Sequence, residues 1–250
     1  MASKSTAKNK KSAPSSPNLP QEKVAASNFL KSLSIDNVIF GLDHGELTIL
    51  LIKHAEGDTR GEWALPGGYI HHNENMSDAA NRLLEDLTGV RDLYLEQLKA
   101  FGKVDRFPKE RVVTIAYYAL VSADKYRLVA GSTILGTSWF SVNDLPKLVY
   151  DHKDIIDYGI DFLRHQVCHQ PVGFNLLPEK FTLLQLQELY EAILNTKLDK
   201  PNFRRKMLKM NLLKPCNEKQ TGVAHRAAAL YRFDAKAYER LTNAGFSFEV

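Results

Sequence analysis

The sequence predicts an α+β protein of two folded units, a layered unit of strands and helices followed by a smaller unit of helices and a hairpin. Its length allows this, because 250 residues suffice for two modest domains. Residues 29–170 carry 15 Lys and Arg against 20 Asp and Glu, whereas residues 171–250 carry 13 against 8. Proline and glycine at Pro171, Gly173 and Pro178 mark the boundary. A basic unit often contacts nucleic acid and an acidic one rarely does, so we expect the two units to have different partners.

The first 28 residues are predicted to be a disordered basic tail. They carry five Lys against one Glu and few large apolar groups, so they bury too little surface to offset the entropy of ordering. They have no apolar stretch typical of a secretory signal, and no segment of the chain approaches the roughly 18 apolar residues of a membrane span. The two cysteines, Cys168 and Cys216, fit a reducing cytosol and offer no metal cluster. We therefore expect a cytoplasmic protein that does not bind membranes.

The layered unit is predicted to span residues 29–168 and begins with strands. Short runs rich in β-branched residues at 37–42 and 47–54 flank a turn containing Gly45, which predicts a hairpin. Residues 61–70 read as a strand with irregular ends. Apolar residues at three- and four-residue spacing then predict a helix over 77–88, with Ser77 and Asp78 at its start and Gly89 at its end. A buried strand over 111–121, a strand and turn over 136–146 and an amphipathic helix over 151–167 complete the unit.

The second unit, residues 169–250, is predicted to be a winged helix-turn-helix. One apolar stripe indicates a helix over 181–194, and a second helix over 201–210 follows a turn in which Asp199 and Pro201 suit a helix start. Two strand-like pieces around a polar loop and a short final helix come next. Helix, turn, helix and β-hairpin is the order of a DNA-binding winged helix.

A spaced motif, "GGYIHHNENMSDAANRLLEDLTGV", connects the strand at 61–70 to the helix at 77–88. It resembles the Nudix box, G-x5-E-x7-R-E-U-x-E-E-x-G-U, in which U is a bulky aliphatic residue. The residues that match the pattern are Gly68, Glu74, Arg82, Leu84, Gly89 and Val90. The resemblance implies a Nudix-like α/β/α sandwich for the first unit.

The same motif departs from the box where the chemistry of the family resides. The resemblance assigns Mg²⁺ to three acids on one helix face, and these positions hold Leu83, Asp86 and Leu87. Leucine cannot bind a metal, and Asp86 alone holds one poorly. Glu85 is one position away, about 100° around the helix. We therefore expect no hydrolytic activity, no bound metal and no cofactor.

A pocket without its metal can still bind an effector. Trp63 could stack on a base or sugar face, while Arg106 and Arg111 could pair with phosphates or sugar hydroxyls; Glu74 remains from the box. The alternative is structural, with Trp63 as a partly buried core aromatic and both arginines in surface or structural ion pairs. His71 and His72 are expected to be exposed loop residues.

The helix at 201–210 is predicted to contact DNA. At 100° per residue, Phe203, Met207 and Met210 form its inner face. The outward residues predicted to contact DNA are Asn202, Arg205 and Lys209, with Arg204 and Lys206 beside them. Arginine and asparagine read guanine and adenine edges, whereas lysine mainly meets phosphate. In the hairpin, Lys219 and Arg226 are the predicted phosphate contacts. A solvated basic face is the alternative.

Over residues 34–245 the chain resembles the Nudix-related bacterial transcription regulators, on the segments "ERVVTIAYYAL", "GFNLLPEKFTLLQLQELYEAIL", "NFRRKM" and "AALYRF". The resemblance implies a homodimer that binds palindromic double-stranded DNA and responds to a small-molecule effector. Some members sense ADP-ribose and others arabinose, and the emptied box resembles the arabinose-responsive branch more closely.

We therefore expect an effector-controlled DNA-binding transcription regulator rather than an enzyme. One alternative is an active Mg²⁺-dependent Nudix hydrolase of a nucleoside diphosphate derivative, with the metal held by Glu74, Glu85 and Asp86. Another is a protein-interaction module, in which the charge of Arg204 and Arg205 would not matter.

Overall fold

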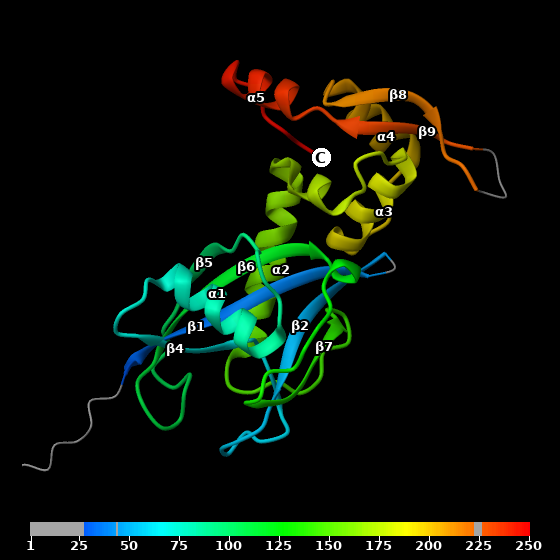
Figure 1. The fold of residues 1–250 in the computed structure, drawn as a ribbon. Helices are drawn as coiled ribbons and strands as arrows, with labels where there is room; N and C mark the ends of the chain where they lie inside the picture. The colour runs from blue at the N-terminus through cyan, green and yellow to red at the C-terminus, as the bar shows by residue number, and fades with distance from the viewer. Residues whose placement is uncertain (1–27, 44, 223–226) are drawn as a thin grey trace, which may run out of the picture.

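The computed structural model describes residues 28–43, 45–222 and 227–250 (Figure 1). The predicted tail therefore lies outside the described residues except for Asn28. No helix among the described residues is long and apolar enough to cross a membrane.

The first unit is built on a seven-stranded mixed sheet around β1 (Phe29–Asp43). This strand pairs parallel with β6 (Val113–Ser122) and antiparallel with β2 (Glu46–His54) and β4 (Gly67–His71). The remaining strands are β3 (Trp63–Ala64), β5 (Glu96–Phe101) and β7 (Ile134–Ser141), and a short 3-10 helix, η1 (Ala123–Lys125), follows β6. The predicted hairpin is confirmed, with Phe40 opposite Ile49.

The sheet extends beyond what local patterns indicated. Strand β1 begins at residue 29 rather than 37, because its first half pairs with β4 and β6, which are distant in sequence. Strand β5 was not predicted; its side chains are mostly exposed, so it lacks an apolar pattern and is held by pairing with β6.

Two helices cover the two faces of the sheet, which confirms the α/β/α sandwich (Figure 1). Helix α1 (Met76–Thr88) packs on the face that carries Ile35 and Ile39, and α2 (His152–His169) packs on the opposite face. Gly89 ends α1 in the left-handed conformation at φ 74°, as predicted. Ser77 and Asp78 lie in the first turn, as predicted; the helix begins one residue earlier, at Met76, after an extended Asn75 whose side chain donates to Asp78 at 2.8 Å.

The second unit is a winged helix. A short 3-10 helix, η2 (Pro171–Leu176), leads into α3 (Leu183–Leu194) and α4 (Lys200–Lys209), followed by β8 (Leu213–Lys219), β9 (Ala229–Phe233) and α5 (Ala235–Asn243). Thr182 and Gln185 form a capping box at the start of α3, and Asp199 caps α4. The backbone N–H and carbonyl groups of Phe181 form hydrogen bonds with those of Tyr231. This antiparallel bridge attaches Phe181 to the β8–β9 hairpin.

The two units share a continuous apolar core. Helix α2 runs from the sheet to the second unit, where Leu163 and Val167 join the cluster that contains Leu186 and Tyr190 (Figure 1). The Arg164 side chain donates to the carbonyl oxygen of Ile193 at 3.2 Å. Helix α2 therefore connects the sheet to the winged helix by direct packing.

Candidate effector pocket and nucleic-acid interface

A cavity of about 220 Å³, the inner pocket, opens beside the first half of β1. Ser34 and Asp36 line it from β1, Gly67 and Gly68 from the start of β4, and the segments around residues 106 and 150 close it. At Gly67 an added Cβ would come within 2.4 Å of Asp36 Oδ1 and of the Ile35 carbonyl oxygen. Only glycine therefore allows this close approach of β4 to the pocket wall.

The inner pocket contains a buried arginine whose charge is fully compensated. Arg106 donates to both carboxylate oxygens of Asp151, at 3.0 and 2.8 Å, and to Asp36 Oδ2 at 3.3 Å. The three side chains are 5–10% exposed. A guanidinium held by two carboxylates has little charge left for an anionic ligand.

The histidines of the inner pocket are neutral near pH 7. The backbone N–H of Leu65 donates to His152 Nδ1 at 2.9 Å, so the ring hydrogen is on Nε2, which faces Asp36 Oδ1 at 3.7 Å. Burial lowers the pKa of His152, although Asp36 opposes the shift. The pKa of His54 is also lowered, by burial and by His152. Each neutral ring therefore has one nitrogen that can donate a hydrogen bond to an uncharged group and one that can accept a hydrogen bond.

The lining of the inner pocket also includes the phenol of Tyr69. Its hydroxyl donates to Glu110 Oε1 at 2.5 Å. Burial and this hydrogen bond raise the pKa of Tyr69 to about 12. The described lining of the inner pocket thus combines hydrogen-bonding groups with apolar side chains such as Phe107 and Val112, and carries no cation without a carboxylate partner.

Glu74 has a structural environment. It accepts two hydrogen bonds from Arg82, at 2.8 and 2.6 Å, and one from the backbone N–H of His71 at 2.7 Å. These contacts lower its pKa to about 2, the Arg82 hydrogen bonds contributing most. Arg82 also donates to the Tyr69 carbonyl oxygen. Glu74 and Arg82 therefore hold the loop before α1 against the second half of β4.

The positions of the box acids are occupied by packing residues. Leu83 and Leu87 are buried, and an added Cβ on Gly68 would lie 2.8 Å from Leu83 Cδ2. Asp86 is exposed and 3.8 Å from Arg82, while Glu85 pairs with Arg91 at 3.0 Å. Among the residues that the structure describes, no three His, Cys, Asp or Glu side chains form a group that could hold a metal.

The other predicted effector residues lie apart from the inner pocket, whose lining includes Arg106 but neither Trp63, Glu74 nor Arg111. Trp63 packs edge-on against Phe140 with ring centroids 4.6 Å apart. Arg111 donates to the carbonyl oxygens of Gly102 and Lys103. The roles of these residues toward an effector stay predictions.

Sequence reasoning missed Asp36 and His152, which line the inner pocket, and Asp151, which pairs with Arg106. An acid within the apolar strand sequence "SIDNVIF" was the available signal for Asp36, because a carboxylate there needs a buried partner. No local pattern pointed to Asp151 or His152.

Helix α4 has the two faces that its sequence predicted. Phe203 and Met207 are buried, whereas Asn202, Arg205 and Lys209 are exposed. The Arg205 guanidinium donates to the Asn202 side-chain oxygen, so the two side chains lie together. This exposed face combines an amide and cations over an apolar anchor.

The neighbouring cations differ in exposure. Arg204 is half-buried, and its Nε atom is buried without a hydrogen-bond partner. Lys206 is close enough to Cys168 to oppose the rise in the pKa of that thiol, which burial causes. Lys219 is exposed at the end of β8, and Arg226 lies outside the described residues. None of these DNA contacts is tested by the structure alone.

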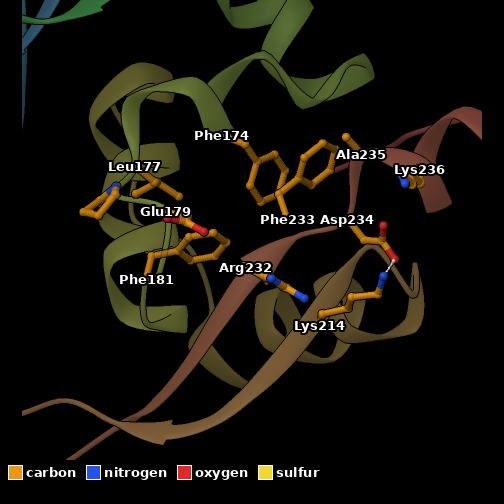
Figure 2. A pocket seen from close by; sticks show the side chains of 11 residues that line it. Phe174, Leu177, Glu179, Phe181, Lys214, Arg232, Phe233, Asp234, Ala235 and Lys236 are labelled. Carbon is orange, nitrogen blue, oxygen red and sulfur yellow. Dashed lines mark ion pairs between the residues drawn. The ribbon is translucent and has the colours of Figure 1, made fainter.

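The base of the wing encloses a second cavity, of about 480 Å³ (Figure 2). Phe174 and Phe233 stack at 4.4 Å on one side, and Arg232 projects from β9 on the other. Lys214 pairs with Asp234 at 2.6 Å. Stacking and this ion pair hold the hairpin on η2 and α5, which sets the position of the wing relative to α4.

Comparisons with known proteins identify both units. A family model described as NUDIX domain matches residues 32–158, and one described as NrtR DNA-binding winged helix domain matches residues 173–233.

An ADPR responsive transcriptional repressor NtrR from Acinetobacter baylyi is 31% identical over 211 residues, which cover 83% of this chain and 84% of that protein. The crystal structure of Shewanella oneidensis NrtR complexed with a 27mer DNA is 28% identical with a TM-score of 0.69, and covers 86% of this chain and 97% of that chain. An ADP-ribose pyrophosphatase from Methanocaldococcus jannaschii is 33% identical over 119 residues, 47% of this chain and 69% of that protein.

Proposed function

The chain belongs to the family that joins a NUDIX domain to an NrtR-type DNA-binding winged helix domain, and we propose that it is a transcription repressor that binds double-stranded DNA and responds to a small-molecule effector. The observation that carries the proposal is the exposed face of α4, on which Asn202 and Arg205 lie together above the buried Phe203 and Met207. A helix of this kind places hydrogen-bond donors at base edges in the major groove.

A gel-shift titration against DNA upstream of the neighbouring genes tests DNA binding. We expect binding to one sequence at moderate salt, and much weaker binding to a shuffled sequence of equal length. Equal affinity for both sequences would overturn the proposal of a sequence-specific repressor. A two-fold symmetric target is expected, because we propose that two copies bind palindromic half-sites. Sedimentation of the protein with and without DNA measures that stoichiometry.

We propose ADP-ribose as the effector. The relative from Acinetobacter baylyi is named as ADPR responsive and the relative from Methanocaldococcus jannaschii as an ADP-ribose pyrophosphatase. A ligand can control DNA affinity only if it binds one state of the protein better than the other. ADP-ribose should therefore both raise the melting temperature of the protein and shift the gel-shift midpoint.

A neutral pentose such as arabinose is the second candidate effector, because of the inner pocket. Its volume of about 220 Å³ suits one sugar ring, and the charge of Arg106 is already compensated by Asp36 and Asp151. Such a pocket fits hydroxyl groups better than a diphosphate. A thermal-shift series with ADP-ribose, arabinose and ribose at equal concentration separates the two candidates, since the ligand with the lower Kd stabilises the protein more.

We also propose that the NUDIX domain does not hydrolyse its ligand. The support is the replacement of two box acids by Leu83 and Leu87, which are buried, and the engagement of Glu74 with Arg82. Incubation with ADP-ribose and Mg²⁺, followed by measurement of AMP, tests this. Turnover at an ordinary enzyme rate, above about 1 per second, would favour the alternative of an active hydrolase.

A further inference from the structure

Another cavity, distinct from the one at the base of the wing, adjoins the inner pocket. This outer cavity has a volume of about 410 Å³ and lies between residues 54–59 and 107–109. Three residues line both cavities, namely His54, Phe107 and Tyr150. The two cavities are therefore adjacent at these three side chains. One extended ligand can reach into both.

Tyr150 occupies that wall in an unusual backbone conformation. Its φ is 49°, a left-handed value that aromatic residues rarely adopt. Its ring contacts Phe107 at 4.9 Å and His152 at 5.9 Å, yet the residue is 41% exposed. The next residue, Asp151, is held by Arg106, so the ion pair of the inner pocket fixes the chain at this point. Unfavourable backbone conformations of this kind persist where the surroundings impose them, and they are frequent at ligand sites.

Lys109 provides an exchangeable cation in the outer cavity. Its ammonium lies 2.8 Å from Asp58 Oδ2, and both side chains are more than 60% exposed. The pKa of Lys109 is raised, mainly by Asp58, with a contribution from the nearby Tyr150 phenol. Exposed pairs are weak, so a phosphate can take the place of Asp58. This contrasts with Arg106, which is buried and bonded to two carboxylates.

We propose that the effector is a two-part molecule, with a neutral sugar end in the inner pocket and phosphates beside Lys109 in the outer cavity, and with Tyr150 as the wall between them. This inference rests on the proposed ADP-ribose effector. The inner pocket alone is too small for a molecule with two riboses, a base and a diphosphate, and its arginine is not available to a phosphate. The outer cavity supplies the missing volume and the missing cation.

The test uses the full chain and measures binding of ADP-ribose and of ribose by titration calorimetry. Lys109→Ala should weaken ADP-ribose binding about tenfold, because it removes a charge-assisted contact. Asp58→Asn should strengthen it severalfold, since it removes a competing carboxylate. Neither variant should change the affinity for ribose. The matched control is Lys180→Ala, because Lys180 is also an exposed lysine with a carboxylate at 2.8 Å but lies in the winged helix.

The Tyr150→Gly variant tests the role of the Tyr150 side chain as the wall between the two cavities. It carries no folding penalty at the backbone, because glycine adopts positive φ freely. We expect its melting temperature to stay within a few degrees of the parent, and its ADP-ribose affinity to fall about tenfold.

The outcomes separate the two levels of the proposal. Opposite effects of Lys109→Ala and Asp58→Asn on ADP-ribose, with unchanged ribose binding, would support the two-part site. A second outcome is that the parent protein binds ADP-ribose with an affinity that Lys109→Ala, Asp58→Asn and Tyr150→Gly all match within twofold. In that case the two-part site is wrong and the proposed effector stands. If the parent protein does not bind ADP-ribose at all, the proposed effector is wrong and the two-part site with it.

Discussion

Replacement of Arg106 by methionine should strongly destabilise the protein. The guanidinium is 5% exposed. One of its nitrogens, Nη2, contacts both Asp36 Oδ2 at 3.3 Å and Asp151 Oδ1 at 2.8 Å. Because they share that nitrogen, the two carboxylate oxygens lie no more than about 6 Å apart. Without the arginine their repulsion is roughly 3 kcal/mol at an effective dielectric constant of 20.

Loss of the hydrogen bonds adds to this repulsion, so we expect a decrease of about 3–5 kcal/mol in the free energy of unfolding at pH 8. Urea denaturation followed by circular dichroism measures it. Adding Asp151→Asn to Arg106→Met should recover part of the stability at pH 8.

The control for this prediction is Arg111→Met. Arg111 is also an arginine of the loop after β5, but it is exposed and bonds to backbone carbonyls, so its loss should cost about 1 kcal/mol or less. The reasoning is refuted if Arg106→Met costs less than about 1 kcal/mol at pH 8, or if adding Asp151→Asn recovers none of the lost stability.

Three further predictions follow from the site and the interface. Glu74 has a folded-state pKa of about 2, below its unfolded value of 4.5, so it stabilises above pH 4.5 and loses that effect as the pH falls through 2. Glu74→Gln should cost about 1–2 kcal/mol at pH 7 and much less at pH 2, measured by urea denaturation. Arg205→Ala should cost roughly 1–3 kcal/mol of DNA binding and relax base preference, whereas Lys209→Ala should weaken all sequences alike, as a gel shift with a substituted-base panel would show. Gly67→Ala should lower the melting temperature by more than 5 °C, because its Cβ would meet backbone at 2.4 Å, whereas Gly136→Ala, with nothing within 4 Å, should change it by less than 2 °C in a thermal scan.

Local signals in the chain predicted most elements of both units. Apolar spacing indicated α1, α2, α3 and α4, and the turn at Gly45 indicated the first hairpin. Asp199 and Gly89 were recognised as helix ends because caps act through bonds to the adjacent turn. Leu83 and Leu87 could also be recognised from the sequence as residues that cannot ligate a cation wherever they lie.

Contacts between distant segments could not be predicted from those signals. Asp36 and Arg106 are 70 residues apart, and Arg106 and Asp151 are 45 apart, so their ion pairs depend on how the loop after β5 folds over the sheet. The separation of Trp63 from the inner pocket and the place of Tyr150 in its wall have the same origin.

Helices, turns and caps depend on interactions within a few residues, and for this reason the sequence identified the two units and the exposed basic face of α4. A binding pocket is formed by side chains that meet only after the sheet has closed, and burial then sets which charges remain available. The sequence suggested Arg106 as a cation for a phosphate; in the folded protein two carboxylates compensate it, and Lys109 retains its exposed charge.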